Sequence, residues 1–492
     1  MTVDLNKRRF ALMALMGAIP LTHMLDLGYG VFSFELLTIT ALFAFTGAML
    51  AFLCRGSGLF GPIMVLALYW FLEVYFLGAM NPVIGITFLV ALLLSLEMKR
   101  IEEWFLPLVG VFAVFFSGTS LLKPGPELLV SHAQASAARP VESEAKKPGN
   151  AVLQIIIDEQ SSPLAMAHTI PDGHAAHGII EDYRKRGFTV HGNAMSISKN
   201  TYESVSAMMN LTDKADNYIK HEVGAAYTYS VKDDRLLQDM QDKGYKLSIL
   251  QTNFLDICRD RKVEECNTYT RANNMGMFAD FDLSYLRRLQ VAAHAIYGDY
   301  TRPNFLSAVH IVQVADRYWH IANQQQEDRA GFFSRPLVVL KMMDVIRGKV
   351  DTLEGGDVHI AHLLLPHFPY VLNADCSFKP MEEWTNPARY SSNPDLSHAY
   401  KGFWDQAVCT HKHLMGIVDA AIAKGNVDVM ILGDHGARIS QTHHTENDVD
   451  LRMTMMAVRR AGLVDEGRVI AAEQNLQKVY INETKGMLSK AE

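Results

Sequence analysis

The hydrophobic pattern divides the chain into two unlike parts. Long apolar stretches fill the first 122 residues, at about 10–27, 31–54, 58–80, 82–97 and 104–122. Each stretch is near the length that a helix needs to cross the hydrocarbon layer of a membrane, although the fourth is short. The pattern therefore predicts an N-terminal α-helical membrane bundle of about five spans.

Positive charges set the orientation that we expect for this bundle. The basic segment 7–9 precedes the first stretch, Arg55 follows the second, and Lys99 and Arg100 stand before the fifth. The alternate loops carry no Lys or Arg, so the positive-inside rule places the N-terminus in the cytoplasm and the C-terminal part outside. Glu35 lies inside the second stretch, where a carboxylate is expected to face a lipid head group, a neighbouring helix or the interface.

A second pattern begins after a segment rich in Ala, Ser, Pro and charge, residues 123–149, which we interpret as a solvated extracytoplasmic linker. Beyond it, apolar runs alternate with helical periodicity. Buried strands are predicted at 151–157, 246–251, 358–366, 427–433 and 453–459, and helices at 232–243, 335–350 and 398–424. This alternation predicts an α/β domain with a largely parallel sheet. The expected organisation is a transmembrane domain (1–122), a linker (123–149) and a catalytic domain (150–492).

Composition adds two constraints. The 492 residues carry a net charge of −7, which gives no sign of a nucleic-acid partner. Of the five cysteines, four lie in the C-terminal part, an even number that could pair in an oxidising compartment. Cys258 with Cys266 is the local candidate pair, and free buried thiols are the alternative.

Acids and imidazoles follow three of the predicted strands. They are Asp158 and Glu159, His362 and His367, and Asp434 and His435. Each set alone has an ordinary explanation as a turn, a helix cap or a hydrogen-bonded histidine. Ligands of open α/β sheets bind beyond the carboxyl ends of the strands, so the three sets are expected at one rim. Oxygen and imidazole ligands together suit Zn²⁺ or Mn²⁺.

A candidate nucleophile lies in "SISKNTYESVSAMMN", residues 196–210. Asn200 followed by Glu203 and an apolar run resembles a capping box, which places Thr201 at the first helical position. Backbone N–H groups and the helix dipole favour negative charge there. A hydroxyl bound to a divalent cation ionises more readily to an alkoxide nucleophile. Thr201 could instead be a plain helix-start residue, and Ser198 and Ser204 are nearby competitors.

In this order, the acid after the first strand, the threonine at a helix start, "HFPY" and "GDHG" resemble the alkaline phosphatase superfamily. Within it, the chain is most similar to the sulfatase-type membrane phosphotransferases: lipoteichoic acid synthases, phosphoglycerol transferases and phosphoethanolamine transferases. The likeness covers the whole architecture of spans, linker and extracytoplasmic domain. It departs from true sulfatases, because the Cys-x-Pro-x-Arg or Ser-x-Pro-x-Arg nucleophile motif is absent around 198–206.

The resemblance implies a role for each candidate residue. The metal would be held by Asp158 or Glu159 together with Thr201, Asp434 and His435, and Asp158 is favoured because it directly follows the strand. His367 in "HFPY" would contact the donor head group or assist proton transfer.

Further substrate contacts follow from the same resemblance. His443 or His444 would match a later histidine that binds a phosphate oxygen or a second metal. Arg438 and Lys199 are candidate phosphate contacts by proximity alone, and either could be a solvated surface charge.

The function implied is a metal-dependent transfer of phosphoglycerol or phosphoethanolamine from a phospholipid donor to a hydroxyl of an envelope glycan or lipid acceptor, through a phospho-threonine intermediate. The protein would be multi-pass in a bacterial cytoplasmic membrane, with its catalytic domain on the periplasmic side. The "HFPY" form favours glycerol phosphate by analogy alone. The alternatives are a membrane-anchored phosphodiesterase or sulfatase-type hydrolase, and a non-catalytic scaffold for envelope polysaccharide assembly. Residues 252–335 carry no readable motif, and we expect an insertion that shapes acceptor binding.

Overall fold

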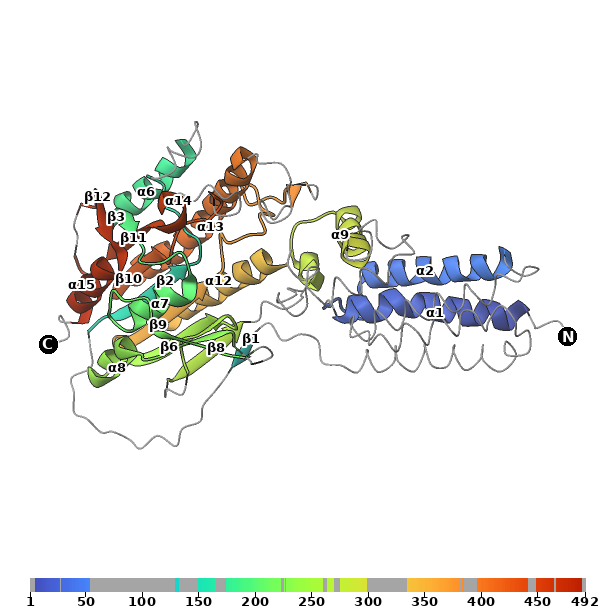
Figure 1. The fold of residues 1–492 in the computed structure, drawn as a ribbon, viewed down its shortest axis with the longest axis horizontal. Helices are drawn as coiled ribbons and strands as arrows, with labels where there is room; N and C mark the ends of the chain where they lie inside the picture. Colours follow the sequence, from blue (N-terminus) through green and yellow to red (C-terminus); the bar gives the residue numbers. More distant parts are fainter. Residues whose placement is uncertain are drawn as a thin grey trace. The chain divides into compact units, whose positions relative to one another are not determined.

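The computed structural model describes residues 5–26, 28–53, 129–131, 149–164, 174–222, 225, 227–259, 263–269, 275–298, 334–380, 383–384, 396–440, 448–463 and 466–488. The chain forms two compact units (Figure 1). Unit 1 combines Met1–Glu127 with Ala272–Ser334, and unit 2 combines Leu128–Arg271 with Arg335–Glu492. Residues 272–334, part of the predicted catalytic domain, therefore group with the N-terminal residues.

Unit 1 is helical in its described part. It contains α1 (Leu5–Asp26), α2 (Phe34–Leu53), the 3₁₀ helix η2 (Met275–Asp280) and α9 (Tyr285–Gly298). Among the described residues, only α2 is long and apolar enough to cross a membrane, and a shorter apolar segment, Leu12–Thr22, lies in α1. The structure therefore supports one candidate span where the sequence predicts about five. The predicted spans at 58–80, 82–97 and 104–122 lie outside the described residues.

Unit 2 is an α/β domain built on a large mixed sheet. In the described residues this sheet has nine strands in the order β1-β8-β6-β9-β2-β10-β11-β3-β12. Their bounds are β1 (Leu129–Ser131), β2 (Ala151–Ile157), β3 (Thr189–Met195), β6 (Lys246–Thr252), β8 (Glu265–Tyr269), β9 (Asp357–Leu363), β10 (Val427–Gly433), β11 (Met453–Arg459) and β12 (Arg468–Asn475). The central strands β8, β6, β9, β2 and β10 are mutually parallel, while β1 and β11 run antiparallel to their neighbours. Strand β1 lies within the segment predicted as a linker.

A strand is present at every position predicted from the apolar runs, and each is buried along most of its length, but the strand predicted at 358–366 ends at Leu363. Strand β2 alternates between two cores. Its Ile156 belongs to the core shared with α7 (Thr201–Met209), α8 (Arg235–Asp242) and α15 (Leu476–Leu488). Its Ile157 faces the opposite layer, beside Ile179 of α6 (His174–Lys185) and Leu414 of α13 (Leu396–Lys424). Helix α12 (Arg335–Thr352) packs against α13 and β9.

Smaller features complete unit 2. A three-stranded sheet joins β4 (Tyr218–Lys220), β5 (Tyr229–Val231) and β7 (Leu255–Asp256). Two disulfides tie the domain together: Cys258 with Cys266, the predicted local pair, and Cys376 with Cys409. The second joins the segment after β9 to α13, and its two cysteines are 33 residues apart in sequence.

Candidate active site

The three central strands bring Asp158, Asp434 and His435 to one rim of the sheet, whereas His362, which was predicted to follow its strand, lies inside β9 and is fully buried. Strand β2 lies between β9 and β10 and is parallel to both. The ladder continues past the strand ends, because the Asp158 N–H donates to Leu363 O (2.9 Å) and the Asp434 N–H donates to Ile157 O (3.2 Å). The residues after β2 and β10 therefore leave the sheet side by side, as ligand-binding residues of open α/β sheets do.

Asp158, Asp434 and His435 form a buried group whose potential ligand atoms all lie within 4.8 Å of one another. His435 Nε2 lies 3.5 Å from Asp158 Oδ1 and 3.3 Å from Asp434 Oδ2. Two carboxylates and an imidazole in this arrangement are a donor set that Zn²⁺ or Mn²⁺ accepts.

Hydrogen bonds fix the direction in which these atoms point. His435 Nδ1 lies 2.8 Å from Gly436 O, and an N–H there can only donate to that carbonyl. This tautomer leaves the lone pair on Nε2, directed at the carboxylates. Asp434 Oδ1 accepts the N–H groups of Glu159 (3.1 Å) and His435 (2.8 Å), which leaves Asp434 Oδ2 on the side of His435 Nε2.

The charges of this group require a positive partner. Burial, and then the nearby Arg438 charge, lower the pKa of His435 well below its usual range, so the ring stays neutral. Burial, and then the charge of Asp158, raise the pKa of Asp434 well above its usual range. Two buried carboxylates beside a neutral imidazole are stable as anions only with a compensating cation. A divalent ion fits the residues present, because it balances two carboxylates and accepts the Nε2 lone pair.

Thr201 is the first residue of α7, and its hydroxyl faces this group. Its Oγ1 donates a hydrogen bond to Asp158 Oδ1 at 3.3 Å and lies 3.1 Å from His435 Nε2. Asn200 is the N-cap, as predicted, but its side chain makes no capping bond to the backbone. Its Nδ2 instead donates to Glu203 Oε2 at 3.1 Å, so the reciprocal capping box is not formed.

The two serines considered as competing nucleophiles are engaged elsewhere. Ser204 Oγ donates to Asp434 O at 2.7 Å and accepts bonds from Ser196 and Gln477. Ser198 Oγ donates to the Glu203 carboxylate. Among these hydroxyls, Thr201 is the one whose hydrogen-bond partners are side chains of the candidate metal site, Asp158 and His435.

Glu159 lies outside the group and pairs with Arg438. Arg438 Nε donates to Glu159 Oε1 at 2.8 Å, and its terminal nitrogen also contacts that oxygen. Burial raises the pKa of Glu159 to about 8, against the opposing effect of the Arg438 guanidinium. His367 also approaches Glu159: its Nε2 lies 3.7 Å from Glu159 Oε1, and its ring is stacked on Phe368.

The "GDHG" glycines permit the close packing that holds this rim. A Cβ on Gly433 would overlap the Thr454 hydroxyl and Gln160, and a Cβ on Gly436 would overlap the Asp450 carbonyl. Two other predicted site residues, His443 and His444, lie outside the described residues. Lys199 is partly buried in the turn before α7.

Two buried residues that the sequence did not single out support the site. Gln406 Nε2 on α13 lies 3.1 Å from each of the carbonyl oxygens of Pro366, His367 and Pro369, which share its two N–H donors, and so it holds the His367 loop. Asp450 accepts the Ser440 N–H and hydroxyl, both at 2.7 Å, next to Arg438. Neither carries a sequence signal, because their partners are set by tertiary packing.

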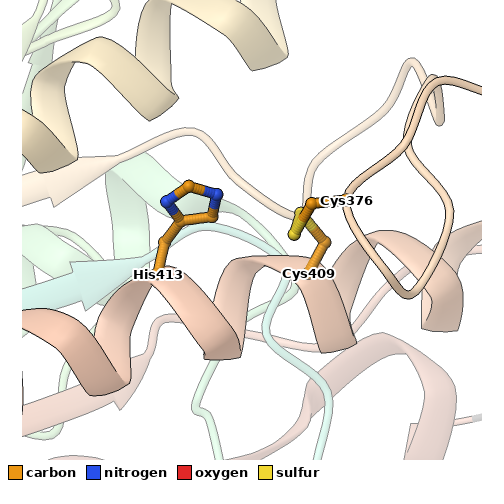
Figure 2. A group of neighbouring side chains, drawn as sticks. All are labelled: Cys376, Cys409 and His413. Carbon is orange, nitrogen blue, oxygen red and sulfur yellow. A yellow bond between two sulfur atoms is a disulfide. The ribbon is translucent and has the colours of Figure 1, made fainter. Parts of the chain in front are cut away.

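A second cluster of metal-ligating residue types has another explanation. Cys376, Cys409 and His413 lie together, and Figure 2 shows that the two sulfurs are bonded to each other. Thiolates are the species that bind metals, so this disulfide serves as a cross-link.

Comparison with protein-family models and with curated proteins gave no match. Solved structures show partial likenesses. The soluble domain of lipooligosaccharide phosphoethanolamine transferase A from Neisseria meningitidis is 11% identical, with a TM-score of 0.37 over 73% of this chain and 90% of that chain. The C-terminal periplasmic domain of phosphoethanolamine transferase EptC from Campylobacter jejuni is 10% identical, with a TM-score of 0.35 over 65% and 81%. BT1596, a 2-O GAG sulfatase, is 13% identical, with a TM-score of 0.41 over 70% of each chain.

Proposed function

We propose that the protein is a membrane-anchored, metal-dependent phosphotransferase that uses Thr201 as its nucleophile. The observation that carries this proposal is the position of the Thr201 hydroxyl, 3.1 Å from His435 Nε2 and 3.3 Å from Asp158 Oδ1. A hydroxyl at a helix start, facing a buried cluster of two carboxylates and a neutral imidazole, is arranged for activation by a divalent cation.

Asp158, Asp434, His435 and Thr201 would hold the metal. A bound Zn²⁺ or Mn²⁺ would lower the pKa of the Thr201 hydroxyl and offset the charge that develops on the phosphoryl oxygens. The backbone N–H groups of the first turn of α7 add a fixed site for that negative charge. Glu159 keeps Arg438 beside the group, where its guanidinium can attract a phosphate.

The reaction then has two steps on Thr201. After its hydroxyl has lost its proton to solvent, the Thr201 oxygen forms a bond to the phosphorus of the donor phospholipid, and the bond from phosphorus to the diacylglycerol oxygen breaks. Diacylglycerol leaves after taking a proton, for which His367 at the same rim is the candidate donor. An acceptor hydroxyl next attacks the phospho-threonyl group and gives its proton to His367, and the bond from phosphorus to the Thr201 oxygen breaks, which releases Thr201 in its deprotonated form.

The rest of the chain suits a lipid donor and an extracytoplasmic site. Helix α2 has the length and composition of a membrane span, which would hold the domain near its lipid. Two disulfides in unit 2 suit an oxidising compartment such as the periplasm. We propose phosphatidylglycerol or phosphatidylethanolamine as donor, with the glycerol form favoured, and an envelope glycan or lipid hydroxyl as acceptor.

The test is release of diacylglycerol from each lipid by the full-length protein in mixed micelles with Zn²⁺ or Mn²⁺. We expect one lipid to be cleaved, and cleavage to stop after chelation and in Thr201→Val, which keeps the side-chain volume without the hydroxyl. If the head-group phosphate is released to water at every acceptor concentration, and none is transferred to the acceptor, the protein is a hydrolase and not a transferase. No cleavage of any phospholipid by metal-loaded, folded protein would overturn the proposal.

A further inference from the structure

Unit 1 exposes a set of large apolar side chains beyond the start of α2. Phe32 is 87% exposed, Phe34 72%, Leu286 72% and Tyr285 38%. We call these four residues the interfacial patch. Phe32 and Phe34 lie at the N-terminal end of α2, whereas Tyr285 and Leu286 begin α9, about 250 residues later in the chain. Phe34 and Tyr285 are in ring contact, and clustered exposed apolar side chains of this kind mark a contact with a membrane or a partner.

Specific contacts hold α9 against the start of α2. Glu35 is 3% exposed, and its Oε1 lies 2.9 Å from Arg288 Nε on α9. Thr38 Oγ1 lies 2.6 Å from the Tyr285 hydroxyl, and the ring of Tyr285 meets Phe34 edge-on at 6.5 Å. A carboxylate is rarely buried without a paired charge, so Glu35 and Arg288 form a polar attachment between the two helices.

The chemistry of the patch matches a bilayer surface. The exposed face of α2 continues from Phe34 through Leu37, Leu42 and Phe45, the face that lipid would cover if α2 spans the membrane. At the end of that face stand Tyr285, an aromatic residue with a polar tip, and the adjacent basic residues of α9. Aromatic and basic side chains of this kind concentrate at the head-group level, where ring and hydroxyl meet different surroundings.

We propose that the interfacial patch inserts into the head-group layer of the membrane, so that α9 is a second, non-spanning membrane contact. Its polar attachment to α2 sets its depth, because Tyr285 hydrogen-bonds to Thr38 and Arg288 forms an ion pair with Glu35, both in the first two turns of the span. Residues 275–298 belong to unit 1 although the chain leaves the catalytic sheet at Tyr269 and returns to unit 2 at Arg335. The chain therefore passes between the two units three times: before β1, after β8 and before α12.

The inference rests on the proposed span of α2 and is tested with the full-length protein in nanodiscs of equal parts phosphatidylethanolamine and phosphatidylglycerol. A Cys54→Ser background leaves the four disulfide-bonded cysteines unreactive. An environment-sensitive fluorophore is then attached to Leu286→Cys. We expect several-fold stronger quenching by a nitroxide placed high on the lipid chains than by aqueous iodide. The reverse order is expected for the matched label on Lys478→Cys, at an exposed position of unit 2.

Three further variants separate the proposed span of α2 from the proposed contact of α9. A label on Phe45→Cys reports the span itself: quenching there by a deep nitroxide, without quenching at 286, would overturn the interfacial contact alone. No lipid quenching at either position would overturn the span and the contact together. Shielding of 286 from both quenchers would mean that protein covers the patch, which also overturns the proposal. Glu35→Gln should reduce lipid quenching at 286, and the exchanged pair Glu35→Arg with Arg288→Glu should restore it. Restoration would distinguish the attachment from a general loss of folding.

Discussion

Glu159 and Arg438 pair beside the candidate metal site, and both hold the left-handed backbone conformation, with φ of 61° and 59°. Non-glycine residues rarely adopt it, and each instance costs roughly 1–3 kcal/mol that the surrounding structure must offset. The pairing has a chemical consequence. It directs the carboxylate of Glu159 to a guanidinium, and leaves its neighbour Asp158 as the acid of β2 that faces Thr201 and His435.

The first prediction concerns which of these two acids holds the metal. Asp158→Asn should lose nearly all bound Zn²⁺ or Mn²⁺, because it removes a charged ligand from the group. Glu159→Gln should keep its metal, since the backbone N–H that bonds Asp434 is unchanged. Elemental analysis of the dialysed proteins measures the metal per chain. The opposite order would assign the site to Glu159 and would show that the Arg438 pair opens when metal binds.

A second prediction tests Gln406, which positions the His367 loop. Gln406→Leu leaves the carbonyls of the His367 loop and the buried Val371 N–H without their partner, so it should destabilise unit 2 by about 2 kcal/mol. Donor cleavage should fall while metal content stays near the wild-type value. Lys401→Ala on an exposed position of the same helix is the control and should change neither quantity. Normal cleavage by folded Gln406→Leu protein would exclude a role for the loop geometry in catalysis.

The third prediction is a pH dependence of stability from His359, a buried residue of β9 whose Nδ1 lies 2.7 Å from Ser248 Oγ. Burial, followed by the charge of Lys349, lowers the pKa of His359 to about 4. Between pH 6.5, the ordinary pKa, and pH 4, His359 is protonated in the unfolded protein but not in the folded protein. The free energy of unfolding therefore falls as the pH falls through this window. At about 1.4 kcal/mol per unit, the loss is roughly 3 kcal/mol.

Thermal unfolding of the wild type and His359→Gln at a series of pH values measures this effect. The variant should lose less stability between pH 6.5 and pH 4. Parallel curves for the two proteins would rule out His359 as a source of the acid sensitivity.

The fourth prediction compares the two disulfides. In the chain-entropy description, the cross-link that closes the longer loop restricts the unfolded chain more. The Cys376–Cys409 bond spans 33 residues and the Cys258–Cys266 bond spans 8. The double variant Cys376→Ser with Cys409→Ser should therefore lose about 1 kcal/mol more stability than Cys258→Ser with Cys266→Ser. Equal losses, or a larger loss at the short loop, would contradict this entropic account.

The sequence was informative where burial alone decides structure. The strands Ala151–Ile157 and Val427–Gly433 are buried along their whole length, so their apolar runs predict them with the observed bounds. Strands β3, β8 and β12 were not predicted, because each carries polar residues such as His191, Asn267 and Glu473. Strand β12 is largely exposed at the sheet edge, where no apolar alternation is required.

The same distinction holds for the candidate site. Parallel strands share a carboxyl end, so the meeting of Asp158 with Asp434 and His435 follows from strand type and is visible in the sequence. The sequence does not tell which of the two acids after β2 faces the candidate metal site. Glu159 pairs with Arg438 instead, and this pairing depends on a loop conformation that no local sequence pattern encodes. The membership of residues 275–298 in unit 1 was equally hidden, since it depends on contacts of α9 with α1 and α2, which are distant in sequence and include the Glu35–Arg288 ion pair.

The central claim is that Thr201 carries the transferred group, and peptide mass spectrometry tests it most directly. Full-length protein with bound metal is incubated with each donor lipid and no acceptor, then quenched in acid and digested. A glycerophosphate or phosphoethanolamine adduct on Thr201, absent from Thr201→Val and unaffected in Ser198→Ala, is the predicted result. An adduct on another residue, or donor cleavage with no covalent adduct at any time point, would contradict the account.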